Sequence, residues 1–180
     1  MTQTAQDMIH FWKEAGPERW FRGGEAFDAQ CREQFLTLHM AASRGERAHW
    51  VVDPEGALAL VLLLDQIPRN IFRGSAHVYA TDRMALSVAD RAIELGHDRQ
   101  FDDALRSFFY MPYMHSESLA HQHRCTELFS QLPGANSAKW ATHHREIIER
   151  FGRFPHRNRL LGRTSTPEEQ AWLDEGGFQG

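Results

Sequence analysis

The chain has 180 residues and a formal net charge of −4, and its 42% hydrophobic and 24% charged residues are typical of a globular protein rather than a disordered one. This length fits one domain, residues 1–180, with a sizeable core. The acidic balance argues against a broad nucleic-acid surface or attachment to an acidic membrane.

Cysteine usage and the absence of membrane signals predict where the protein resides. Only Cys31 and Cys125 occur, both within helical apolar patterns, so we expect no disulfide framework and a reducing compartment. The N-terminus lacks a positively charged region followed by an apolar run, which argues against a secretory signal. The longest apolar run, Ala57 to Leu64, is too short to span a bilayer. The sequence therefore predicts a soluble, cytoplasmic protein and leaves its oligomeric state open.

Helical periodicity accounts for the first half of the chain. A short helix over residues 5–12 is expected to close at Gly16-Pro17. The next apolar stripe recurs at steps of three and four residues: Phe27, Cys31, Phe35, Leu38 and Ala42. Asp53-Pro54 then opens a helix whose body, residues 57–64, is apolar on every side. We expect that body to be the buried central helix.

The second half shows further helix starts and no strand. The residues expected to begin its helices are Ser75, Asp98, Pro112 and Asn136. Thr166-Pro167-Glu168-Glu169 offers an N-cap, a proline at the first position and a glutamate three residues after the cap. Since no convincing alternation of apolar and polar residues occurs, the pattern predicts an all-α fold of about seven to nine helices.

Three helix junctions share one form, an apolar residue followed by proline and a run of polar side chains. They lie at Asp65–Asn70, Tyr110–Glu117 and His143–Asn158. We expect them to converge on a single polar pocket that the helices hold in place. The third junction is also the most basic part of an otherwise acidic chain.

The polar side chains of these junctions suit an anionic ligand. A guanidinium group presents a planar fork that matches a carboxylate or a phosphate. The candidate ligand-binding residues are Gln66, Arg69, Asn70, Arg73, Arg153, Arg157 and Asn158. The alternative for any single arginine is an ion pair with Asp65, Glu146 or Glu149, or a bond to the free carbonyls at a helix end.

The histidines are candidates for acid–base work, because imidazole titrates near neutral pH. The chain contains 11 of them. His115 is expected at a helix start, His144 on the apolar stripe of a helix, and His156 in the arginine-rich loop. Asp65 or Glu117 could orient them. The alternative is that His144 is a satisfied core residue and His156 an ordinary loop side chain.

The sequence gives little support for a metal site, a catalytic nucleophile or a nucleotide-binding motif. His121 and Cys125 lie one helical turn apart, but the ligand set around them is incomplete, so we predict no metal site. The chain contains no nucleophile elbow, phosphate-binding glycine loop or dinucleotide fingerprint, and no cofactor is expected.

The motifs together resemble the bacterial domain-of-unknown-function family nine-two-four over nearly the whole chain. The stretches that carry the resemblance are 64–74, 110–117, 144–158 and 161–169, with Phe11-Trp12 and Phe27-Asp28. It implies an all-helical fold of antiparallel, tetratricopeptide-like helix pairs, and it implies no reaction. Gln122 matches the family and joins the ligand-binding candidates, whereas His121 and Cys125 depart from its pattern.

Two classes of function remain. The first is a protein that binds or transforms a small anionic metabolite in the arginine- and histidine-rich pocket; whether it is an enzyme is left open. The alternative is a protein-interaction module that binds an acidic peptide or a C-terminal carboxylate. The chain is short for a long peptide groove, which favours the first class. Nucleic-acid binding ranks last.

Overall fold

The computed structural model describes residues 3–133 and 135–180, and within them it contains helices and turns but no strand. The predicted all-α class is confirmed. The chain forms two compact units. Unit 1 contains the described residues up to Arg73 together with His77–Pro112, and unit 2 contains Gly74–Ala76 and Tyr113–Gly180. That residues 1–180 act as one domain, and that the helix pairs are tetratricopeptide-like, stay predictions.

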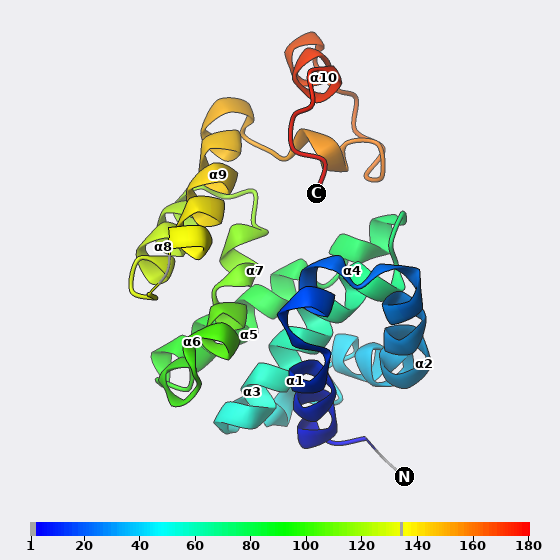
Figure 1. Cartoon of the computed structure of the whole chain (residues 1–180), viewed down its shortest axis with the longest axis vertical. Helices are drawn as coiled ribbons and strands as arrows, with labels where there is room; N and C mark the ends of the chain where they lie inside the picture. The colour runs from blue at the N-terminus through cyan, green and yellow to red at the C-terminus, as the bar shows by residue number, and fades with distance from the viewer. Residues whose placement is uncertain (1–2, 134) are drawn as a thin grey trace. The chain divides into compact units, whose positions relative to one another are not determined.

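The helices can be followed along the chain in Figure 1. Up to Met114 they are α1 (Ala5–Arg22), α2 (Gly24–Ser43), η1 (Ala48–Val52), α3 (Pro54–Val61), η2 (Leu62–Gln66), α4 (Ile67–Ile71), η3 (Ala76–Tyr79), α5 (Asp82–Glu94), η4 (Asp98–Gln100), α6 (Asp103–Arg106), η5 (Ser107–Phe109) and α7 (Met111–Met114). Beyond it they are α8 (Leu119–Phe129), α9 (Ala135–Phe151), η6 (Pro155–Arg157) and α10 (Pro167–Asp174).

The core of unit 1 is built around α3, which continues through η2 into α4. All residues from 56 to 68 are buried, which confirms the predicted central helix. α1 and α5 pack against α3, and α2 packs against α4. The apolar stripe predicted over residues 27–42 supplies the buried face of α2. In α1, Gly16 has φ +71° and kinks the helix before Pro17, at the position where the sequence predicts a break.

Two predicted helix starts of unit 1 are wrong. Thr81, not Ser75, is the N-cap residue of α5. Asp98 begins only the short η4, and Asp102 caps α6 by accepting a hydrogen bond from the backbone N–H of Leu105 at 3.0 Å. Several aspartate, serine and threonine residues lie close together before these helices, so the local pattern does not select the one that caps.

The helix predicted from Pro112 is also interrupted. α7 ends at Met114, and residues 115–118 form a loop before α8, so His115 does not begin a helix. The fully buried amide of Gln122 fixes this break. Its Nε2 lies 2.8 Å from the Met114 carbonyl oxygen and 2.7 Å from that of Ser116. These bonds satisfy carbonyls that an ended helix leaves without partners.

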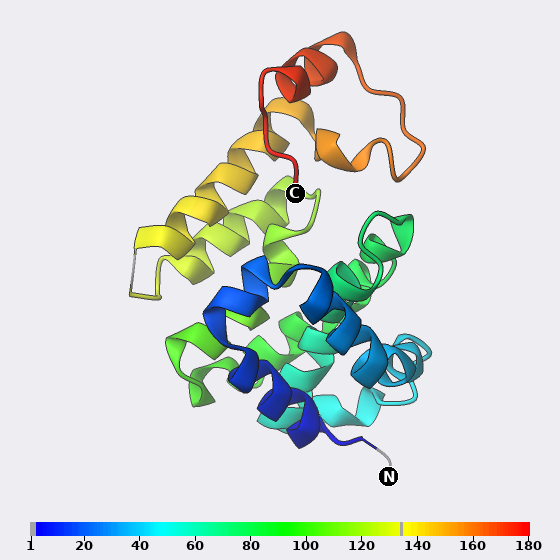
Figure 2. The same ribbon diagram turned by 45° about the vertical axis from the view of Figure 1, so that its right-hand side comes forward.

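Unit 2 is built on α8 and α9, which lie side by side in Figures 1 and 2. The expected N-cap Asn136 lies outside the residues whose side chains are described. α10 begins with the predicted capping box: the Thr166 hydroxyl accepts from the Glu169 N–H at 3.2 Å, and the Glu169 carboxylate accepts from the Thr166 N–H at 2.8 Å. This helix start is confirmed.

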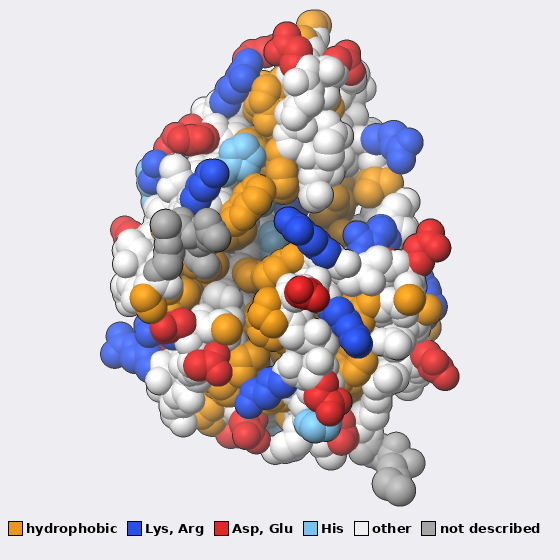
Figure 3. Space-filling view, viewed as in Figure 1, with side chains coloured by type: hydrophobic (Ala, Val, Ile, Leu, Met, Phe, Trp, Pro, Cys, Tyr) orange, Lys and Arg blue, Asp and Glu red, His pale blue; other side chains and the backbone are white. Residues whose placement is uncertain are grey.

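No helix among the described residues combines the length and the apolar character needed to cross a membrane. On the face shown in Figure 3, Lys and Arg side chains are interspersed with Asp and Glu.

Candidate functional site

The first junction contains a π-helical turn at the end of the buried helix. The Ile67 N–H bonds to the carbonyl oxygen of Leu62, five residues back. Pro68 has no N–H with which to continue that pattern. The carbonyls that follow Leu62 therefore need partners from elsewhere, because a buried carbonyl without one is costly.

Side chains from neighbouring helices supply those partners. His39 Nδ1 donates to the Leu63 carbonyl at 2.8 Å, and the Thr81 hydroxyl donates to the Leu64 carbonyl at 2.6 Å. Both donors are buried. Burial lowers the pKa of His39 from its usual value although the hydrogen bond to Leu63 opposes the shift. The π turn thus ties α2 and the start of α5 to the central helix.

The charged residues of this junction are engaged with one another. Asp65 is fully buried and accepts from Gln66 Nε2 at 2.6 Å. Arg69 lies 3.3 Å from Asp65 and 3.0 Å from Asp82, and it also donates to the Asp65 carbonyl. A buried carboxylate requires such a partner. The structure therefore gives Asp65 and Arg69 a defined structural role.

Asn70, the last residue of the first junction, and Arg73, which follows it, are also held by protein groups. Asn70 donates from Nδ2 to the Gln66 carbonyl at 3.1 Å. Arg73 makes a two-pronged contact with Asp28, with Nε–Oδ2 at 2.7 Å and Nη2–Oδ1 at 3.0 Å. The Arg73 side chain is 63% exposed, so this ion pair is a surface contact between two segments of unit 1.

In unit 2, Glu117 joins the second junction to the third. Arg163 holds it with Nη1–Oε2 at 2.7 Å and Nη2–Oε1 at 2.9 Å, and the Phe154 N–H donates to Oε1 at 2.8 Å. Burial alone would raise the pKa of Glu117, but the hydrogen bonds from Arg163 and Phe154 hold it below its usual value. Glu117 is therefore ionised and anchors the loop that follows α9.

A second carboxylate anchors the same loop from α10. Glu169 accepts from Arg153 Nε at 2.6 Å and Nη2 at 2.7 Å, and from Asn158 Nδ2 at 3.2 Å. The hydrogen bonds from Arg153 are the main reason that its pKa falls to about 2. Asn158, 1% exposed, also accepts from Arg163 Nε at 2.9 Å. Arg153 and Asn158 thus hold the loop in shape.

His144 is buried in an aromatic environment on α9. Its Nδ1 donates to the Trp140 carbonyl at 2.9 Å, and its ring lies 4.9 Å from the Phe178 ring and 5.6 Å from the Phe154 ring, centroid to centroid. Burial is the main cause that lowers its pKa to about 3, and the charge of His115 also lowers it. His144 is therefore neutral at neutral pH.

His156 shares that environment. Its ring lies 5.1 Å from the Phe178 ring, and its Nδ1 is buried with no hydrogen-bond partner among the described residues. Burial, and next the charge of Arg157, lower its pKa to about 4. His115 lies close enough to lower the pKa values of both His144 and His156. The three predicted histidines, which come from three segments, thus lie together in unit 2.

Arg157 completes this group. It is 7% exposed, its Nη2 donates to the His115 carbonyl at 2.8 Å, and its guanidinium lies 4.6 Å from the centroid of the Phe154 ring. Stacking on an aromatic face suits a guanidinium and fixes its orientation. We call His115, His144, His156 and Arg157 the histidine cluster.

Two of the three junctions that were predicted to converge meet within one unit. The second and third junctions meet in unit 2 through Glu117 and the histidine cluster. The first junction, from Asp65 to Asn70, belongs to unit 1, and its convergence with the other two stays a prediction. So do the catalytic roles of Asp65 and Glu117 and the ligand-binding role of Gln122, although each side chain has protein partners.

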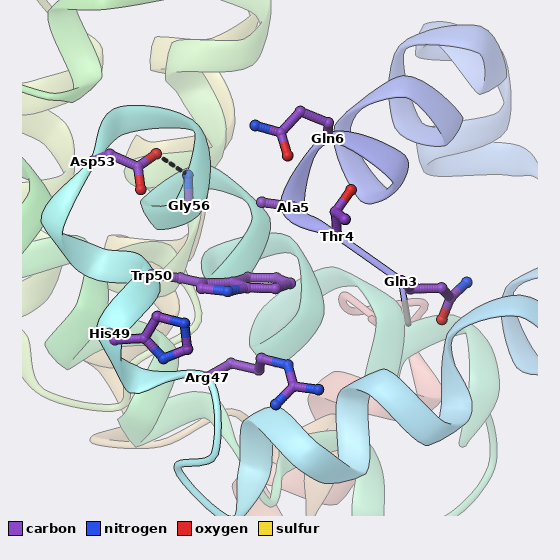
Figure 4. A pocket seen from close by; sticks show the side chains of 9 residues that line it. All are labelled: Gln3, Thr4, Ala5, Gln6, Arg47, His49, Trp50, Asp53 and Gly56. Atoms are coloured by element: carbon purple, nitrogen blue, oxygen red, sulfur yellow. Dashed lines mark hydrogen bonds between the residues drawn. The ribbon is translucent and has the colours of Figure 1, made fainter. Parts of the chain in front are cut away.

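No group of three or more His, Cys, Asp or Glu side chains within the described part of the chain could hold a metal ion. A pocket of about 520 Å³ lies on unit 1 instead, lined by residues outside the three junctions, among them Arg47, His49 and Trp50 (Figure 4). The sequence offered one signal for it, a tryptophan in the segment between two helices.

Comparison with known proteins gives one family and one close structural relative. The family described as "Bacterial protein of unknown function (DUF924)" matches residues 8–177. A solved structure, that of the protein of unknown function ATU0120 from Agrobacterium tumefaciens, is 49% identical in sequence. It covers 96% of this chain and 97% of its own, with a TM-score of 0.93. No curated protein matches the chain.

Proposed function

The chain belongs to the bacterial family DUF924, and we propose that it binds a small anionic metabolite at the histidine cluster of unit 2. The observation that carries the proposal is the grouping of three imidazoles beside a buried guanidinium. Clusters of side chains with strongly shifted pKa values occur more often at functional sites than elsewhere.

The charges around His156 favour an anion. Arg157 and Arg163 both lower the pKa of His156, whereas Glu117 alone raises it. The Glu117 carboxylate is already held by Arg163. A guanidinium group presents a fork that matches a carboxylate or a phosphate, so these neighbours favour an anion as the ligand.

The imidazoles suit binding better than proton transfer. General acid–base catalysis works best when the pKa of the group lies near the working pH. The pKa values of His144 and His156, about 3 and about 4, lie well below neutrality. The neutral ring of His156, whose Nδ1 has no hydrogen-bond partner among the described residues, can donate one N–H to a bound anion, so we propose a binding protein rather than an acid–base enzyme.

Thermal unfolding of the purified protein with a panel of phosphorylated metabolites, dicarboxylates and acidic peptides tests the proposal. A ligand at 100 times its dissociation constant should add about 2.7 kcal/mol of stability. We expect a metabolite to stabilise the wild type but not Arg157→Gln. The matched control is Arg159→Gln, which removes an exposed arginine from the same loop and should leave the effect intact.

The other outcomes separate the alternatives. Stabilisation by acidic peptides alone would favour the protein-interaction module, with the histidine cluster holding a peptide carboxylate. If Arg157→Gln does not fold, His156→Asn is tested in its place, because it removes an imidazole without removing a charge. No stabilisation by any anion, or stabilisation that survives both variants, would contradict the proposal.

We also propose a cytoplasmic location. Cys31 and Cys125 are both buried, and neither forms a disulfide. Burial raises the pKa of each thiol to about 12. Buried, protonated thiols are packing residues rather than reactive ones, which agrees with a reducing compartment.

A further inference from the structure

The pocket on unit 1 is a second site, separate in its residues from the histidine cluster. It lies between the first turn of α1 and the segment from η1 to the start of α3 (Figure 4). The Trp50 ring extends across it, with Arg47 and His49 on one side, Thr4 and Gln6 on the other and Gln3 beyond the end of the ring. Its volume of about 520 Å³ is in the range of small-molecule sites.

The backbone that carries Trp50 is fixed by the start of α3. A Cβ on Gly56 would lie 2.1 Å from the Trp50 carbonyl oxygen, so only glycine permits this close approach. The Gly56 N–H donates to Asp53 Oδ1 at 2.8 Å, and the Trp50 N–H donates to the Arg47 carbonyl at 2.9 Å. The ring is therefore attached to a rigid support.

The charges in the pocket are distributed unevenly. The Arg47 guanidinium lies 5.9 Å from the centroid of the Trp50 ring. The neighbouring Glu46 is held by Arg44 at 2.6 Å. On the opposite side, Glu55 accepts from Gln6 Nε2 at 2.8 Å. Among the residues that line the pocket, Asp53 is the acidic side chain, and its Oδ1 accepts the Gly56 N–H; Arg47 is the cation.

We propose that this pocket binds a small planar aromatic anion, with its ring against Trp50 and its negative charge at Arg47. An indole face offers a large, flat contact surface. A guanidinium beside that surface adds a charge-assisted hydrogen bond to a carboxylate or phosphate. The His49 ring, 6.4 Å from that of Trp50 and nearly perpendicular to it, bounds the same side. The proposed ligand must therefore be both aromatic and anionic.

Fluorine NMR of 4-fluorobenzoate tests this, with 4-fluorobenzamide as the neutral aromatic probe and cyclohexanecarboxylate as the non-aromatic anion. We expect 4-fluorobenzoate to bind more tightly than either. Trp50→Leu and Arg47→Gln should each weaken it on the order of tenfold. The matched controls are Trp140→Leu and Arg91→Gln, an exposed tryptophan and an exposed arginine elsewhere, which should change the affinity less than twofold.

Each remaining outcome contradicts the proposal. These are no binding of 4-fluorobenzoate, equal binding of the three probes, or binding unchanged in both pocket variants. Arg47 lies outside the buried core, so Arg47→Gln should fold. It therefore still tests the proposal if Trp50→Leu fails to fold. Arg157→Gln should leave this binding intact, which separates the pocket from the histidine cluster.

Discussion

Arg163 holds Glu117 with both of its terminal nitrogens, at 2.7 and 2.9 Å, across 46 residues of sequence. Glu117 also accepts the Phe154 N–H. This one pair therefore positions the loop between α9 and α10 against the loop before α8. Those two loops carry His115, His156 and Arg157, so the pair supports the geometry of the proposed anion site.

Glu117→Gln should destabilise the protein by about 2 kcal/mol, since the pair is part-buried and its loss leaves Arg163 without its carboxylate. Chemical unfolding with urea measures this. The control is Glu168→Gln, which removes the more exposed pair with Arg150 and should cost less than about 0.5 kcal/mol. If the two variants lose the same free energy of unfolding, Glu117 does not anchor the loop.

Thr81→Val should cost about 1–3 kcal/mol, because it leaves the buried Leu64 carbonyl without its donor. Thr126→Val is the control: its hydroxyl bonds to the His123 carbonyl of the same helix on the surface, so little should change. If the two variants are equally stable, the π turn does not depend on Thr81.

Acid should destabilise the folded state before most carboxylates titrate. His144 and His156 have folded pKa values of about 3 and about 4, below the usual 6.5. The unfolded chain therefore takes up protons first as the pH falls, and the free energy of unfolding drops from about pH 6.5 towards pH 4. Each histidine should contribute about 1.4 kcal/mol per pH unit in that window.

Urea unfolding across this pH range measures the slope of the free energy of unfolding against pH. His144→Gln and His156→Gln should each flatten it, whereas His123→Gln, at an exposed position on α8, should not. A slope that is the same in all three variants would exclude the buried histidines as its origin.

Phe178→Ala should raise the pKa values of His144 and His156 towards 6.5. The Phe178 ring contacts both imidazoles, and burial is the largest cause of both shifts. Histidine titration by NMR measures the effect. Leu119→Ala, which trims an exposed apolar side chain of unit 2, should leave both values unchanged. Unchanged values in Phe178→Ala would show that other groups keep water from the rings.

Local sequence patterns predicted the helices well. The run from residue 57 to 64 is buried as its composition indicates, and the capping box at Thr166 and Glu169 is present as its spacing indicates. Both signals lie within a few residues, where periodicity and capping act. The break at residues 115–118 was missed, because it depends on the amide of Gln122 from the following helix.

The site was predicted less completely for the same reason. The sequence singled out the histidines, but the partners of the arginines are distant: Asp28 lies 45 residues from Arg73, and Glu117 lies 46 from Arg163. Tertiary packing selects such pairs, and composition does not. Several arginines expected to bind a ligand therefore hold carboxylates of the protein itself, while the pocket at Trp50 carried no recognisable motif.

The central claim is that the histidine cluster binds an anion. NMR titration of the imidazoles of His144 and His156, with and without saturating inorganic phosphate, tests it most directly. A bound anion stabilises the protonated ring, so we predict that phosphate raises the pKa of His156 in the wild type and not in Arg157→Gln. Identical titration curves with and without phosphate would contradict the account.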